Sequence, residues 1–214
     1  MCSKQNLQCD NDNGELKLLL RQLQKSFKIV QQCVSTWSLV LTELRPHVVT
    51  LNNLTEQFSS CHSVTNIQLT ALTSQLPDVK DKLLHKVQQE VDAKLVIMQE
   101  KLSTLHELCG KISKQCKYST DLYTKNCVSL DLITVTSGSA TRPSIADMLE
   151  WLQDTEQLFL QRYWARVHIL DQFRLEDKST HLPDNTTWNG DDNDIQKQFQ
   201  EKMVYLTLFL EEKL

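Results

Sequence analysis

Gly110-Lys111 and His106-Glu107 are the two dipeptides whose residue types suggest nucleotide or zinc chemistry. A phosphate-binding loop needs a second glycine five residues before Gly110 and a Ser or Thr after the lysine. Leu105 and Ile112 occupy those positions. A zinc-protease motif, H-E-x-x-H, needs histidine at its fifth position, where Gly110 stands. We therefore expect neither an ATP-hydrolysing loop nor a zinc-protease site.

Cysteine and histidine are the other residues here that could bind a metal or act as nucleophiles. The seven cysteines are widely spaced and include no C-x-x-C pair, so reduced thiols are expected. Cys61-His62 lacks a second ligand pair at zinc-finger spacing. The six histidines are scattered, and no Ser or Cys lies in a nucleophile context such as G-x-S-x-G. We predict no catalytic residue, no metal site and no cofactor, and therefore a protein that is not an enzyme.

The charge balance argues for protein partners. The chain of 214 residues has 23 basic and 27 acidic residues, and its basic residues form no long block. We therefore expect no direct contact with nucleic acid. No apolar run approaches the roughly 20 residues that span a bilayer, and the first residues lack the apolar segment of a signal peptide. A soluble intracellular protein without membrane contact is expected.

The elements that would position any site are predicted to be helices. Only four Gly and four Pro occur, which suits helices and not a turn-rich β fold. Apolar residues alternate at spacings of four and three, as in a coiled coil, from Leu16 to Leu44. Pro46 is expected to end this first helix. The predicted fold is all-α, an elongated helical bundle with long coiled-coil-like helices.

Four further helices follow from the pattern of apolar residues and caps. A second helix is expected to carry Val48 to Cys61, and a third to begin at Pro77-Asp78 and reach Cys116. A Ser144/Asp147 capping box predicts a fourth helix from Ser144. This helix has two apolar faces, the second containing Trp151 and Leu158, which suits a partner and the last helix equally. The last helix is predicted to begin near Ile195.

The same pattern divides the chain into regions. We expect a disordered tail over residues 1–13, a helical coiled-coil region over 14–118 and a linker over 119–142. A C-terminal helical region over 143–214 is expected to contain a loop at 178–194.

One stretch of the chain resembles a known family. Residues 143–154, P-S-I-A-D-M-L-E-W-L-Q-D, closely resemble the signature of the AIRIM family, which are ribosome maturation factors that associate with AAA+ ATPases. Weaker similarity appears at residues 76–83 and 209–212 in the same order. The resemblance covers the chain from Gln22 onward.

The resemblance implies a non-catalytic adaptor subunit in a complex with a ring of AAA+ ATPase subunits. A small helical sister subunit would form a heterodimer with this chain. The complex would release and recycle an assembly factor during cytoplasmic maturation of the large ribosomal subunit, whose precursor this chain would meet indirectly. A role in protein unfolding on replicating chromatin is also implied, and with it a cytoplasmic and nuclear location.

The predicted partner-binding residues fall into two groups. The heptad residues are expected to pair with the sister subunit, whereas residues of the Ser144 helix would hold the fold or face the ATPase. The two groups are Leu20, Leu23, Phe27, Val34 and Trp37, and Ser144, Asp147, Met148, Trp151, Leu152 and Leu158. The alternative function is a structural coiled-coil component of a tether, centrosomal or kinetochore assembly, which homodimerisation through Leu16 to Leu44 would favour.

Overall fold

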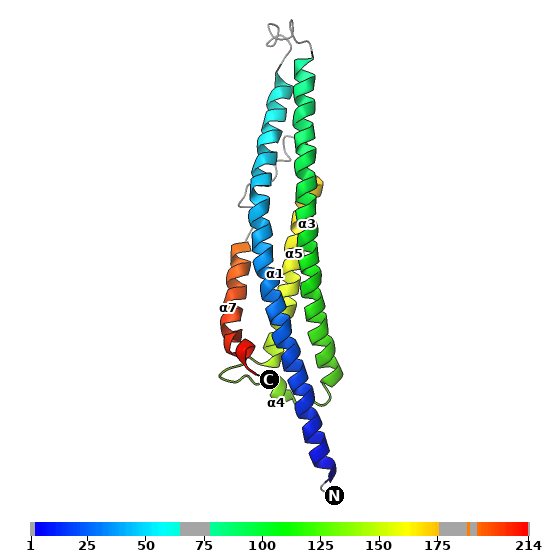
Figure 1. Cartoon of the computed structure of the whole chain (residues 1–214), viewed down its shortest axis with the longest axis vertical. Coiled ribbons are helices and arrows are strands. Elements are labelled where there is room, and N and C mark those ends of the chain that lie inside the picture. The colour runs from blue at the N-terminus through cyan, green and yellow to red at the C-terminus, as the bar shows by residue number, and fades with distance from the viewer. Residues whose placement is uncertain (1–2, 65–77, 176–187, 189–191, 214) are drawn as a thin grey trace. The chain divides into compact units, whose positions relative to one another are not determined.

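The computed structural model confirms the all-α fold class (Figure 1). It describes residues 3–64, 78–175, 188 and 192–213, of which residues 3–13 and 192–196 are described by their backbone alone. These residues form five helices and no strand. The helices are α1 (Ser3–Ser63), α3 (Val79–Asn126), α4 (Leu132–Thr136), α5 (Ile145–Gln172) and α7 (Asp192–Glu211).

The helices contribute to two compact units, each of which is built from separate stretches of the chain. Unit 1 comprises Met1–Trp37, Glu107–Arg162 and Asp191–Leu214, and unit 2 comprises Ser38–His106 and Tyr163–Gly190. Neither unit is continuous in sequence, so a contiguous region such as 14–118 contributes to both. Whether the predicted regions behave as domains stays a prediction.

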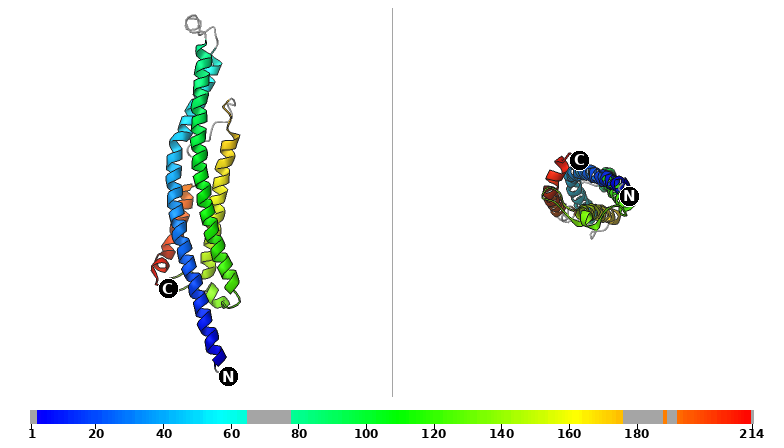
Figure 2. Two further views of the ribbon diagram at one scale, coloured as in Figure 1. Left: turned by 45° about the vertical axis from the view of Figure 1, so that its right-hand side comes forward. Right: turned by 90° about the horizontal axis from the view of Figure 1, so that it is seen from below.

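In unit 1 the N-terminal part of α1 packs with α3, α5 and α7 (Figures 1 and 2). α1 meets α3 where the hydroxyls of Ser26 and Ser119 lie 3.0 Å apart, and it meets α5 where Trp37 contacts Phe159. α5 and α7 run antiparallel, because Asp154 pairs with Lys202 while Trp151 lies beside Tyr205. Successive helices in the unit thus alternate in direction, as in an up-and-down helical bundle.

The core of unit 1 contains residues of the apolar stripes that the sequence predicts and also Leu19 and Phe209, which lie beside those stripes. Each helix turns one stripe inward, because apolar side chains at spacings of three and four lie on one face. Burial of these side chains from water is the main contribution that holds the helices together. Its largest fully buried members are Leu19, Leu23, Phe27, Ile112, Ile145, Phe159 and Phe209.

In unit 2 the remainder of α1 pairs with the N-terminal part of α3. Lys101 of α3 forms an ion pair with Glu43 of α1. The Lys80 ammonium donates to the carbonyls of His62 and Val64, at 3.2 and 2.7 Å, which satisfies acceptors that the end of α1 leaves open. The buried apolar residues of this unit include Leu44, Val48, Leu51, Val91, Met98, Leu105 and Trp188.

Pro46 does not end the first helix, so that prediction is wrong. α1 continues to Ser63 with Pro46 inside it. Proline removes one backbone hydrogen bond, which costs about 3 kcal/mol in a helix interior. The buried stripe nevertheless continues from Leu44 to Val48 and Leu51 on the far side. Packing of the stripe offsets the local cost, and the predicted second helix is therefore the second half of α1.

Other boundaries also differ from the sequence prediction. α1 begins at Ser3, within the predicted tail 1–13, and α3 extends to Asn126, within the predicted linker 119–142. The extension is explained by the burial of Ser119, whose small hydroxyl packs against α1. α4 lies in the same predicted linker. Most of the predicted 178–194 loop lies outside the described residues, although Asp192 already begins α7.

Candidate partner-binding site

The five predicted heptad residues lie in the chain's own core. Their side chains are buried, with exposed fractions of 6% or less. In unit 1 they face the other helices of the same chain, as the contact between Trp37 and Phe159 illustrates. Their pairing with a sister subunit stays a prediction, and it requires a rearrangement that frees this face. The residues are Leu20, Leu23, Phe27, Val34 and Trp37.

The start of α5 is fixed by a helix cap. The amide of Asp147 donates a hydrogen bond to Ser144 Oγ at 3.0 Å, as the predicted capping box requires. Ser144 is buried and the Asp147 side chain is exposed, where its charge suits the helix N-terminus. The reverse bond, from the Ser144 amide to the Asp147 carboxylate, is not among the hydrogen bonds of the described residues. The first half of the capping box is thus confirmed.

The first turns of α5 divide between core and surface. Met148 and Leu152 are fully buried, so these two predicted site residues hold the fold of unit 1. Trp151 and Leu158 are half-buried on the side that faces α7. The second apolar face of α5 therefore has α7 as its neighbour and retains exposed area for a partner.

A hollow of about 310 Å³ forms where the chain enters α5. Ser139 and Arg142 close the turn before the helix with two backbone hydrogen bonds, of 2.7 and 3.3 Å. Asp147 and Trp151 contribute the helix side, and Tyr205 of α7 closes it with its ring centroid 6.3 Å from that of Trp151. Two aromatic rings together with one cation, Arg142, and one carboxylate, Asp147, are suited to an amphipathic peptide segment.

The outward apolar strip of α7 was not predicted from the sequence. Val204, Tyr205 and Leu208 are exposed by 72%, 69% and 56%. Val204 and Leu208 point away from the buried Leu206, and Tyr205 lies next to the buried Phe209, so the apolar surface of the last helix extends beyond its buried side. The spacing of i, i+1 and i+4 is the signal that could have revealed it. We call Trp151, Val204, Tyr205 and Leu208 the α5–α7 face.

One ion pair and two hydrogen bonds hold α7 in the position that forms this face. Asp154 of α5 pairs with Lys202 of α7 at 3.0 Å. Gln24 of α1 donates to the carbonyl of Phe209 and, at 3.0 Å, to that of Glu212. The last carbonyls of a helix have no partner within it, so the Gln24 amide supplies one. α7 is thereby joined to both α5 and α1 by polar contacts.

The buried thiols of unit 1 are unsuited to nucleophilic chemistry. Burial raises the pKa of Cys109 from 9.0 to about 11. Burial, reinforced by the neighbouring Glu156, raises the pKa of Cys116 to about 12. Burial also raises the pKa of Cys33. These groups are neutral thiols at physiological pH, whereas the reactive form of cysteine is the thiolate.

The described part of the chain shows neither a metal-binding cluster nor a membrane-spanning helix. Within it, no three His, Cys, Asp or Glu side chains gather in a way that would hold a metal ion. Among the described helices, none combines the length and apolar character needed to cross a bilayer.

Comparison with known proteins places the chain in a family. Residues 17–212 match the family described as Ribosome biogenesis protein C1orf109-like. Relatives named AFG2-interacting ribosome maturation factor occur in Mus musculus, with 28% identity over 92% of this chain and 91% of the relative. The Xenopus tropicalis relative of that name is 33% identical over 70% of this chain and 72% of its own length. The Homo sapiens relative is 27% identical over 89% of this chain and 94% of its own.

These matches confirm the resemblance inferred from residues 143–154. They extend across α1, α3, α5 and α7. The chain belongs to the C1orf109-like family of ribosome biogenesis proteins.

Proposed function

We propose that this chain is a non-catalytic adaptor subunit that docks on a AAA+ ATPase during maturation of the large ribosomal subunit. The ATPase would supply the work of releasing and recycling an assembly factor, and this chain would place it on the precursor. The names of the mouse, frog and human relatives support both the ATPase partner and the ribosomal role. The adaptor acts in the cytoplasm and the nucleus in this proposal.

The α5–α7 face is the observation that carries the proposal. Protein interfaces concentrate their binding energy in a few aromatic and apolar side chains. Trp151 lies in the family-like stretch 143–154, and Tyr205 extends its aromatic surface onto α7. Val204 and Leu208 continue the apolar surface outward. We assign the ATPase contact to this face.

The competing function, a structural coiled-coil component, needs a heptad stripe that is free to pair with another chain. In unit 1 that stripe is covered by α3, α5 and α7, and its Leu23 and Val30 are fully buried. Pairing through it would require the chain's own helices to move away. The covered stripe favours the adaptor over the coiled-coil component, and it makes the sister-subunit contact a separate question from the ATPase contact.

Binding of the purified full-length chain to its AAA+ ATPase tests the proposal. Tyr205→Glu and Leu208→Glu place a charge on exposed positions and should leave the fold intact. Loss of an interface hot spot costs about 2 kcal/mol or more, so each variant should weaken binding by roughly 30-fold. Trp151→Asp is a less clean test, because Trp151 is half-buried and its replacement also affects packing.

Val128→Glu is the matched control. Val128 is 98% exposed and lies outside the α5–α7 face, so a charge there should leave ATPase binding unchanged. Equal binding by all variants would remove this face from the proposal. Recovery of self-paired chains in place of an ATPase complex would favour the structural coiled coil.

A further inference from the structure

A row of cations runs along the exposed side of α1 in unit 1. Lys17, Arg21, Lys25 and Lys28 follow one another at intervals of four, four and three residues, and all are exposed. At a rise of about 1.5 Å per residue, intervals of three or four place neighbouring cations on one helix face, about 4.5–6 Å apart along the axis. Because the row contains no contiguous basic block, it was not predicted from the sequence. We call these residues the α1 basic row.

The row lies in a stretch of α1 that contains no acidic residue, although Glu211 of α7 lines a hollow together with Lys28 at the end of the row. No acidic residue occurs between Glu15 and Glu43, although the whole chain carries 27 acidic residues and a net charge of −4. Glu15 itself is engaged by the Ser129 hydroxyl. Within the described residues, no ion pair and no side-chain hydrogen bond involves Lys17, Lys25 or Lys28. The positive charge of these lysines is thus available to a ligand.

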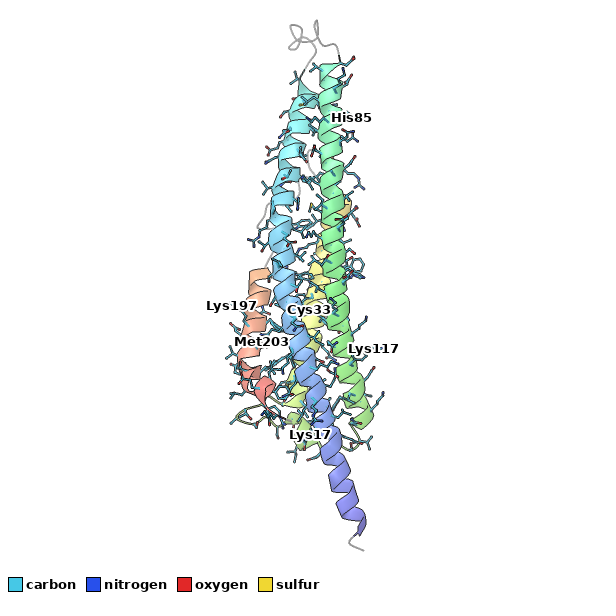
Figure 3. All side chains as sticks on the ribbon, in the orientation of Figure 1. Lys17, Cys33, His85, Lys117, Lys197 and Met203 are labelled. Atoms are coloured by element: carbon cyan, nitrogen blue, oxygen red, sulfur yellow. The ribbon has the colours of Figure 1, made fainter. Side chains whose placement is uncertain are left out.

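A second set of lysines lies on the same unit. Lys114, Lys117 and Lys125 are exposed on α3, and Figure 3 shows Lys117 on the outward side of that helix. They fall within one third of the helix circumference, on the side away from the buried Ile112 and Cys116. We call them the α3 basic row. Unit 1 therefore carries two outward rows of positive charge.

The residues of the α1 basic row indicate which kind of partner it suits: a membrane surface, a protein interface or a nucleic acid. An interfacial membrane helix needs a free apolar face. The apolar face of α1 is buried in the core. The centre of a protein interface is rich in aromatic residues and poor in lysine. The row is mostly lysine, and its exposed neighbours on α1 are Leu18, Gln31 and Gln32. A phosphodiester backbone needs only an array of cations at a regular spacing.

We propose that the α1 basic row binds the phosphate backbone of a nucleic acid. The site is independent of the α5–α7 face, because it lies on another helix and uses charge in place of apolar contact. RNA and DNA present the same phosphate chemistry, and membership in a ribosome biogenesis family favours RNA. The proposal replaces the expectation that this protein makes no direct nucleic-acid contact.

Salt dependence of binding is the direct test. Fluorescence anisotropy would follow the full-length chain with labelled single-stranded RNA, double-stranded RNA and double-stranded DNA. Each neutralised phosphate contributes about 0.7 to the slope of log K against log salt for a single strand. K17Q/K25Q/K28Q should therefore reduce that slope by about 2 and weaken binding on the order of 100-fold at 0.1 M salt.

K82Q/K86Q/K197Q makes the same change in net charge at exposed positions outside both rows. This variant should retain the parent slope, which excludes a simple effect of total charge. K114Q/K117Q/K125Q separates the α3 basic row. An effect confined to this last variant would overturn the assignment to α1.

The remaining outcomes also decide the proposal. Preference for RNA would support a ribosomal precursor as the source of the phosphates, and preference for DNA would support the same site with chromatin as the source. Poly-glutamate that competes as effectively as RNA would overturn it, because the row would then be a site for acidic protein. Absence of binding at 50 mM salt by the parent chain would overturn it as well. ATPase binding should be unaffected in K17Q/K25Q/K28Q, so failure of this proposal is distinguishable from failure of the adaptor function.

Discussion

The rings of Trp37 and Phe159 meet edge to face in unit 1, with centroids 4.8 Å apart and planes at 73°. This geometry places the positive edge of one ring on the negative face of the other, and it is worth about 0.5–1.5 kcal/mol beyond the area that is buried. Both side chains are almost inaccessible to water. The pair joins a heptad position of α1 to the helix that carries the family-like stretch.

Phe159→Ala should destabilise the protein by about 3–5 kcal/mol, because it removes both the ring contact and buried apolar area. Urea unfolding measures the change. Val128→Ala, at an exposed position, should shift stability by no more than about 0.5 kcal/mol. A Phe159→Ala effect as small as that control would mean that the pair contributes little to the core.

We expect alanine substitutions at Ser26 and Ser119 to lower the stability of the protein by different amounts. Ser119 has Ser26 as its hydrogen-bond partner, whereas Ser26 also accepts from Gln22 at 3.0 Å and donates to Gln115 at 3.3 Å. Ser26→Ala leaves the buried Ser119 hydroxyl without a partner, which costs about 1–3 kcal/mol. Ser119→Ala should cost less.

A double-mutant cycle by chemical denaturation tests this relationship. The double variant should be less destabilised than the sum of the single variants, because it removes both hydroxyls. Strict additivity would show that the two hydroxyls do not interact.

The sequence was sufficient to predict where the core lies. Heptad spacing identifies a buried face without knowledge of its neighbours, so Leu23, Phe27 and Met148 were correctly expected to be apolar contact residues. It does not reveal whether the neighbour is the same chain or another one. For the α1 residues, the covering helices come from parts of the chain more than 70 residues away.

The outward surfaces were less predictable. Tyr205 lies beside Trp151 only because α5 and α7 are antiparallel, and the pairing register of two helices is set by three-dimensional packing. The α1 basic row has helical periodicity and no contiguous block, so a search for charged runs does not detect it. Pro46 is the opposite case. The local rule that proline ends a helix predicted a break there, but burial of the apolar residues on either side of Pro46 outweighs it.

Pro46→Ala should stabilise the protein. The substitution restores a backbone donor inside α1 and relieves the clash of the proline ring with the preceding turn. Pro46 is exposed, so alanine creates no cavity. A gain of about 1–3 kcal/mol is expected in chemical denaturation, and Arg45→Ala, at the neighbouring exposed position, should remain within about 0.5 kcal/mol. A loss of stability would show that the proline shapes the packing of unit 2.

Stability should fall as pH rises above about 9. Burial raises the pKa of Cys109 to about 11, from 9.0 in the unfolded chain. Between these values the folded state holds a proton that the unfolded state has released, so the contribution of this thiol is complete below pH 9 and is lost toward pH 11. Cys109→Ala should show a shallower decline of melting temperature from pH 8 to 10.5, whereas Cys127→Ala, at an exposed position, should follow the parent. Parallel declines in all three proteins would rule out a contribution from the buried thiol.

Alkylation should discriminate sharply among the cysteines. Cys127 is exposed, whereas Cys33, Cys109 and Cys116 are buried and have raised pKa values. Iodoacetamide reacts with the accessible thiolate, so Cys127 should be modified first at pH 8 and the three buried thiols only as unit 1 opens. Peptide mass spectrometry over time gives each rate, and denaturant should bring the buried thiols to the rate of Cys127. Equal rates without denaturant would mean that the core of unit 1 opens on the timescale of labelling.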